Sequence, residues 1–240
     1  MGTDEGRQVS AERREHLRAR LDGYHSPAAV LRGVCELCVA ELTISGARIR
    51  VLGGTRANGG GALLHSTDEL GTRLDDLANT TGTGPCVDAF TSGRPVLVPD
   101  LADDGLRWPG FTPDAVRAGA GAVFSFPLQV GAVRLGVLEL HRRTTGSLAP
   151  AELTDALLLA DVATDTIFHD LHGEGPMSLP ALVDIQAEVH QATGMVAVTL
   201  GVSLPEAFLR LRGHAFARHK SLTEVARDII ERRLRLNPGE

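Results

Sequence analysis

The chain has 240 residues, of which 43% are hydrophobic and 22% charged, and its formal net charge is −6 at neutral pH. One or two globular domains with a real core are expected from these values. No apolar run approaches the roughly twenty residues of a membrane-spanning helix. Residues 1–20 are too charged for a secretory signal. Three cysteines predict no disulfide framework and a cytoplasmic location.

Residues 1–25 are expected to be a flexible or loosely helical lead-in, and a first domain follows over residues 26–172. Apolar residues at three- and four-residue spacing predict helices over residues 27–42, 70–79 and 150–169. Alternating apolar residues predict strands over residues 47–52, 62–66, 94–99, 122–130 and 132–141. The glycine-rich segment 53–61 is expected as a loop, and Gly131 as a hairpin turn. This order predicts an α+β domain whose antiparallel sheet is flanked by helices.

A second module is expected after a linker over residues 173–180, where glycine and proline break the helical pattern. It covers residues 181–236, with a tail over 237–240. Three helices are predicted, over residues 180–200, 204–219 and 222–236. Gly201 is a candidate cap for the end of the first helix, and Ser203 and Ser221 each precede a glutamate by three residues, as in a capping box.

The second helix of this module has two apolar strips. Leu204, Ala207, Phe208, Leu211 and Ala215 share an arc of about 100° and are predicted to face the core. Leu209 and Phe216 lie on the far side, and such a second strip is more often a dimer or interdomain contact than a chemical site. Together with the long helix over residues 150–169, it predicts a homodimer.

The module is locally basic. Residues 207–236 contain eight lysine or arginine residues and three acidic residues. Such a patch is able to contact nucleic-acid phosphates, although arginines also cover ordinary solvated helices. The cations that we assign to nucleic-acid contact are Arg210, Arg212, Arg218, Lys220 and Arg227.

The spacing of particular residues over the three helices resembles a known family. The pattern is Gln191-Ala192-x-Gly194-Met195-Val196, Gly201-Val202-Ser203-x-x-Glu206-Ala207, Leu211-Arg212-x-x-Ala215 and Leu222-x-x-Val225-Ala226. It resembles the ANTAR domain, an RNA-binding output module of bacterial antitermination regulators, over roughly residues 182–236. The resemblance implies binding to paired RNA hairpins in a leader transcript. Arg212 stands where the family has its own arginine, whereas Thr193 stands where many members have a lysine.

The first domain has motifs that resemble the GAF sensor domain, especially as fused to ANTAR modules in actinobacterial-type proteins. They are Gly82-Thr83-Gly84-Pro85-Cys86-Val87-Asp88-Ala89-Phe90, Arg107-Trp108-Pro109-Gly110-Phe111, Phe124-Ser125-Phe126-Pro127-Leu128 and Leu135-Gly136-Val137-Leu138-Glu139-Leu140. The resemblance implies a pocket between the sheet and the helices for an unknown small molecule or a protein partner. The residues assigned to ligand binding are Cys86, Trp108, Phe111, Phe124 and Phe126. Trp108 and Phe111 either form a lid or anchor a loop on the core.

Catalysis has little support in the sequence. Cys35 and Cys38 have C-x-x-C spacing but lie inside a predicted amphipathic helix, and no second pair completes a metal site. They are therefore expected to be core residues. Cys86 lies near a predicted helix start, which lowers the pKa of a thiol, and it is the better candidate for a reactive one. A buried structural cysteine is nevertheless the favoured interpretation of Cys86. We expect no cofactor, no metal and no enzymatic activity.

These expectations combine into a cytoplasmic, signal-responsive regulator that binds RNA and controls transcription termination or antitermination. One alternative is a DNA-binding transcription regulator, because two short helices joined by Arg218, His219 and Lys220 imitate a helix-turn-helix. Another is a ligand or redox sensor that acts only through protein contacts.

Overall fold

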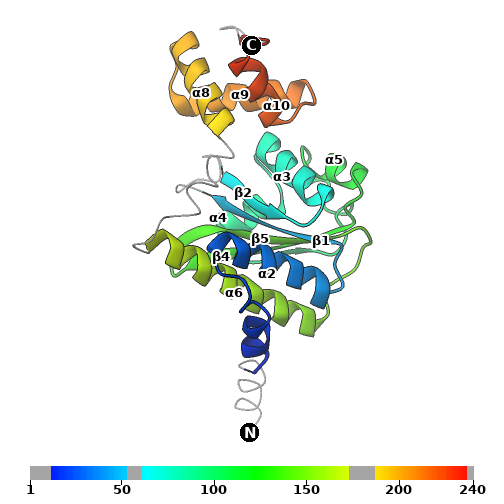
Figure 1. The fold of residues 1–240 in the computed structure, drawn as a ribbon. Coiled ribbons are helices and arrows are strands. Elements are labelled where there is room, and N and C mark those ends of the chain that lie inside the picture. The colour runs from blue at the N-terminus through cyan, green and yellow to red at the C-terminus, as the bar shows by residue number, and fades with distance from the viewer. Residues whose placement is uncertain (1–11, 53–60, 173–186, 237–240) are drawn as a thin grey trace.

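A computed structural model describes residues 12–52, 61–172 and 187–236 (Figure 1). The first two ranges form a domain built on one sheet, here called the sheet domain, and the third forms the helical module. The predicted linker over residues 173–180, the tail and most of the glycine-rich segment 53–61 lie outside the described residues.

The sheet has five strands in the order β2-β1-β5-β4-β3, and neighbouring strands are antiparallel throughout. Their bounds are β1 Gly46–Leu52, β2 Gly61–Ser66, β3 Val96–Val98, β4 Ala122–Val130 and β5 Val133–Arg142. Gly131 turns the hairpin between β4 and β5 with a φ of 57°. The strand expected over residues 94–99 is reduced to three residues because Pro95 and Pro99 have no N–H for the ladder. The predicted antiparallel sheet is confirmed.

Helices cover both faces of this sheet. Their bounds are α2 Pro27–Glu41, α3 Glu69–Thr81, α4 Pro85–Ser92, α5 Thr112–Arg117 and α6 Pro150–His172. On one face α2 and α6 pack side by side over the strands, and on the other lie α3, α4 and α5 (Figure 1). Each face has its own buried apolar cluster. The short helix α5 was not predicted.

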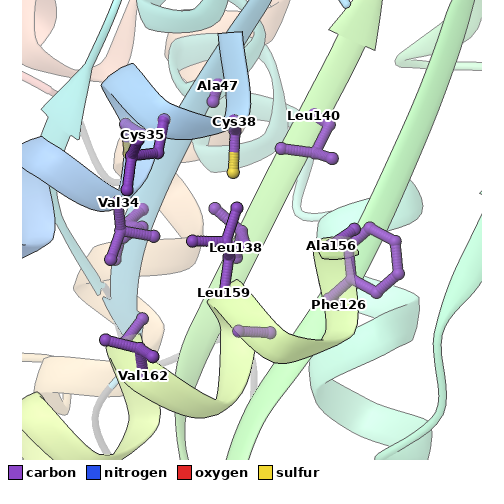
Figure 2. Packing of buried hydrophobic residues seen from close by; sticks show 14 of the residues in the cluster. Val34, Cys35, Cys38, Ala47, Phe126, Leu138, Leu140, Ala156, Leu159 and Val162 are labelled. Atoms are coloured by element: carbon purple, nitrogen blue, oxygen red, sulfur yellow. The ribbon is translucent and has the colours of Figure 1, made fainter. Parts of the chain in front are cut away.

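The cluster under α2 and α6 contains Cys35 and Cys38 (Figure 2). In Figure 2 the sulfur of Cys38 points from α2 toward Leu138, and both cysteines are fully buried. Burial raises the pKa of both thiols well above the ordinary value. They are therefore packing residues, as expected from their helical setting.

The lead-in is helical over residues 12–19 and packs on the sheet domain. Leu17 is fully buried and Leu21 is 6% exposed, and both belong to the cluster under α2 and α6. Arg13 binds Asp155 of α6 at 2.9 Å. From residue 12 onward the lead-in is thus a part of the domain rather than a free extension.

The helical module consists of α8 Ala187–Leu200, α9 Leu204–Ala217 and α10 Leu222–Ile230. Gly201 ends α8 with a φ of 65°. Ser221 forms a complete capping box with Glu224, whereas Ser203 accepts one bond from the Glu206 N–H at 3.4 Å. Residues 180–186 of the first predicted helix lie outside the described part of the chain.

A third apolar cluster holds the module together. On α9, Ala207, Leu211 and Ala215 are fully buried, as predicted. The prediction for Leu204 was wrong, because this residue is 59% exposed at the first turn, where α9 has not yet reached its neighbours.

The module lies at the α3 end of the sheet domain, with α9 and α10 against α3 (Figure 1). None of the three buried clusters contains residues from both parts. Among the described residues, no single helix has the length and apolar character to cross a membrane. The stretch over α8 and α9 meets that test only as a pair bent by 107°.

Candidate ligand and nucleic-acid sites

A layer of buried charges lies between the sheet and α3. Arg48 of β1 binds Asp75 of α3 at 2.6 Å and also binds Glu139 of β5. The Ser125 hydroxyl donates to Glu139 at 2.6 Å, and Arg50 binds Asp75 at 3.2 Å. Exposure of Arg48, Arg50, Asp75 and Glu139 is 1–3%. Two cations and two carboxylates therefore balance in a space that water does not reach.

These charged residues were missed by sequence reasoning. Arg48 and Arg50 alternate with Ala47, Ile49 and Val51, a pattern that usually marks a solvated strand face. Here α3 covers that face, so the arginines need carboxylate partners. The signal available in the sequence was Asp75, an acidic residue in the helix predicted after the second strand.

The five residues assigned to ligand binding do not line one pocket. Cys86, Trp108 and Phe111 belong to the cluster under α3, α4 and α5. Phe124 and Phe126 belong to the cluster on the opposite face, under α2 and α6. The sheet separates the two groups, so a ligand that contacts one group does not reach the other. A ligand role stays a prediction for the first group.

Trp108 and Phe111 anchor their loop on the core. Trp108 is 2% exposed and Phe111 fully buried. The Trp108 indole N–H donates to Asp88 of α4 at 3.2 Å, and the same carboxylate binds Arg107 at 3.0 Å. The Arg107 guanidinium also lies over the indole ring at 4.4 Å. Of the two readings left open by the sequence, this arrangement favours the anchored loop over the lid.

Cys86 is a buried core cysteine rather than a reactive thiol. It lies at the start of α4, as expected, but burial and the nearby Glu139 raise the pKa of its thiol to about 12. The lowering of the thiol pKa by the helix N-terminus is outweighed by the loss of hydration, because Cys86 is 1% exposed. Cys86 is protonated at neutral pH, and its structural role is to fill the core beside the buried charges.

Most cations assigned to RNA contact already have partners inside the chain. Arg210 binds Glu206 at 3.0 Å, Lys220 binds Asp228 at 2.8 Å, and Arg227 binds Glu188 at 3.2 Å. These pairs are half-exposed, so phosphate is able to compete for the cations at modest cost. Arg218 is exposed and has no ion pair with the described residues.

Arg212 is turned toward the sheet domain. Its Nε donates to the carbonyl of Thr80, in the last turn of α3, at 3.4 Å. Its guanidinium lies 5.8 Å from the centre of the Phe208 ring. Burial lowers the pKa of Arg212. The structure thus places this candidate RNA contact at the interface between the two parts.

A second basic site was missed by the sequence reasoning. A groove of about 410 Å³ lies between α8 and residues 232–236, with an apolar floor that includes Val196 and Ile229. Arg232 and Arg235 line it, and neither has an ion pair with the described residues. The backbone of Arg232 is left-handed, with a φ of 58°. Both arginines lie beyond the end of α10, because the helix predicted over residues 222–236 ends at Ile230.

A larger cleft separates the two parts of the molecule. It has a volume of about 530 Å³ and is lined by α3 and α5 on one side and by α9 and α10 on the other. Asp76, Arg117, Phe216 and Glu224 are among the residues that line it. The second apolar strip of α9 is therefore split: Phe216 faces this cleft, whereas Leu209 is 56% exposed elsewhere.

Comparisons with known families agree with this architecture. A family model of the GAF domain matches residues 25–167, and a family model of the ANTAR domain matches residues 181–230. The chain belongs to the GAF domain family and carries an ANTAR domain after its GAF domain. Both resemblances seen in the sequence are confirmed. No curated protein matches the chain.

Solved structures of GAF domains share the fold of the sheet domain. The GAF domain of an Acinetobacter phosphoenolpyruvate-protein phosphotransferase is 12% identical, with a TM-score of 0.52 over 68% of this chain and 96% of that one. The GAF domain of a Coxiella burnetii phosphoenolpyruvate-protein phosphotransferase is 13% identical, with a TM-score of 0.53 over 68% and 95%. At these identities the likeness concerns the fold alone.

Proposed function

We propose that this chain is a cytoplasmic RNA-binding regulator that controls transcription termination or antitermination in response to a signal. The ANTAR domain binds hairpins of a leader transcript, and the GAF domain responds to a small molecule or a protein partner. The observation that carries the proposal is the presence of both domains in one chain, in contact through α3, α9 and α10. The role needs binding and no catalysis.

RNA contact is assigned first to the arginines that are not engaged elsewhere. Arg218, Arg232 and Arg235 are exposed and have no ion pair among the described residues. Such side chains bind phosphate without first breaking an internal pair. Lys220, Arg210 and Arg227 contribute after exchanging their carboxylate partners for phosphate.

The first experiment recovers the RNAs that the full-length protein binds in cells. The enriched leader RNA, a duplex DNA of equal length and an unrelated hairpin are then compared by fluorescence anisotropy at moderate salt. Preferential binding to the leader RNA supports the proposal. Preferential binding to duplex DNA would support the alternative of a DNA-binding regulator, and binding to neither would favour a sensor that acts through protein contacts.

A second experiment asks which arginines contact phosphate. Arg235→Ala should lower the slope of log affinity against log salt by about one unit, as expected for one lost phosphate contact. Arg233→Ala is the matched control, because it removes the same charge from the same segment but Arg233 is held by Asp228 at 2.9 Å. Equal effects of both variants would remove the assignment of the groove to RNA.

A further inference from the structure

We propose that the contact between Arg212 and the end of α3 is a self-inhibiting latch: the GAF domain holds this arginine away from RNA until the two domains part. The inference rests on the proposed function and names how the same site is regulated. The latch is formed by the end of α3 and the residues of α9 that meet it, and an open cleft lies beside them.

The end of α3 is built to accept a cation. The last carbonyls of a helix have no partner within it and carry the negative end of the helix dipole. Thr80 lies in that last turn, and its carbonyl accepts from the Arg212 Nε at 3.4 Å. An arginine is therefore stabilised at this point by a hydrogen bond and by the field of the helix.

Gly82 leaves the space that the arginine occupies. It ends α3 in the left-handed region, with a φ of 67°. A Cβ built on Gly82 would overlap the guanidinium of Arg212. The latch therefore depends on the lack of a side chain at this position.

Phe208 and Arg212 also close a small opening toward the buried charges. A space of about 10 Å³ remains between them and a set of sheet-domain residues that includes Arg50, Asn79 and Cys86. This is room for about one water molecule. The Nε of Arg50, which is 3% exposed, has no hydrogen-bond partner in the described structure. The arginine of α9 thus seals a polar interior as well as capping a helix.

The latch is able to open because the two domains do not share a core. The cleft of about 530 Å³ lies beside the contact, and no buried cluster of described residues bridges the domains. Interfaces of this kind within one chain resemble transient contacts between proteins. Arg212 cannot bind α3 and RNA at the same time. The apparent RNA affinity is therefore the affinity of the open form multiplied by the fraction of molecules that are open.

The test uses the full chain and the variant Gly82→Asn. Asparagine tolerates the left-handed region, so the end of α3 is kept, and the flexible arginine is the group that must move. Gly93→Asn is a matched control: Gly93 ends α4 with the same φ of 67°, and a Cβ there would meet the side chain of Gln129 rather than the ANTAR domain. Urea midpoints of both variants show whether the fold is intact.

The readout that needs no RNA is the rate at which phenylglyoxal modifies Arg212, relative to the exposed Arg218. We expect Arg212 to react roughly fivefold more slowly than Arg218 in the wild type and at a similar rate in Gly82→Asn. Phe216→Ala gives a second way to open the latch should Gly82→Asn fail to fold, because it removes a ring of α9 that lines the cleft and lies close to Gly110 of the sheet domain. Gly93→Asn should behave as the wild type.

The second readout is the affinity for the enriched leader RNA, which we expect to rise about three- to tenfold in Gly82→Asn and to stay unchanged in Gly93→Asn. Equal reactivity of Arg212 and Arg218 in the wild type overturns the latch. The latch is also overturned if the wild type binds RNA and a variant in which Arg212 is released binds it with the same affinity. If Arg212 is released as expected but no form binds RNA, the closed contact stands and the proposed function fails.

Discussion

Arg48 is a charge that water cannot reach, held by two carboxylates from different elements of the sheet domain. Removing one member of a buried ion pair leaves the other charge buried without a counter-charge. The stability lost in this way exceeds the stability that the intact pair contributes. The buried charges therefore make α3 dependent on its position over β1 and β5. Since α3 also carries the contact with Arg212, the same residues orient the end of the helix that the ANTAR domain meets.

We expect Arg48→Met to lower the free energy of unfolding by about 3–5 kcal/mol, because Glu139 is left buried without a cation and Asp75 keeps only its pair with Arg50. Arg18→Met removes an exposed pair with Asp165 and should cost less than about 1 kcal/mol. Urea unfolding followed by circular dichroism measures both. A similar small loss in the two variants would contradict the account of the buried layer.

Asp76 links pH to the contact between the domains. Burial raises the pKa of its carboxyl from 3.8 to about 6, with further increases from Asp75 and Glu224 that Arg48 and Arg50 oppose. The folded chain therefore binds more protons than the unfolded chain between about pH 4 and pH 6. The contribution of the Asp76 carboxyl to stability is fully present below about pH 4 and is lost as the pH rises through 6.

We expect Asp76→Asn to remove this dependence. Between pH 5 and pH 7 the wild type should lose about 1 kcal/mol relative to the variant, a value reduced for partial exposure of the carboxyl to solvent. Urea midpoints of both proteins at the two pH values provide the comparison. A constant difference between them would show that the carboxyl titrates as an exposed group does.

At the scale of elements, the helices of the ANTAR domain are set by their caps and their buried faces. The capping box of α10 satisfies two N–H groups, those of Ser221 and Glu224, at 2.8 and 3.1 Å. The cap of α9 has one bond at 3.4 Å, and its Glu206 carboxylate binds Arg210 instead of returning to the cap. The shorter helix thus has the better cap.

Because of this difference, Ser221→Ala should cost about 1–2 kcal/mol of stability and Ser203→Ala about 0.5 kcal/mol. Thermal unfolding of the two variants under identical conditions gives the ranking. A larger loss for Ser203→Ala would mean that the cap of α9 is tighter in solution.

At the scale of the whole molecule, the expected homodimer stays a prediction. Part of the α6 surface that favoured it is occupied by the chain's own residues 12–19, which bind α6 through pairs such as Arg13–Asp155. The large apolar residues exposed on the described part of the ANTAR domain are Val198, Leu204, Leu209 and Phe216, at 85%, 59%, 56% and 53%. They make this domain the favoured place for a contact between copies.

We expect light scattering at tens of micromolar to report a dimer, and Leu209→Glu to shift the mass toward the monomer because a charge would be buried at the contact. Val133→Glu is the control, since Val133 is 58% exposed at the hairpin of the sheet domain. A monomer mass for the wild type would contradict the prediction.

The amino-acid sequence by itself determined most elements and both families. Helical spacing, strand alternation and the serines before α9 and α10 are local signals, and local signals survive in the folded chain. The buried residues Ala207, Leu211 and Ala215 of α9 were predicted in this way. The errors at this level were local too, such as Leu204 at an exposed helix start.

Only the tertiary structure decided which surfaces meet. Alternation puts Phe124 and Phe126 on one face of β4, but it does not tell which helices cover that face. In the same way, arginines on β1 have the pattern of a solvated strand until α3 covers them, and Arg212 has the pattern of a free basic side chain until α9 meets the end of α3. Such pairings join residues as far apart as Thr80 and Arg212, and no local pattern of the sequence encodes them.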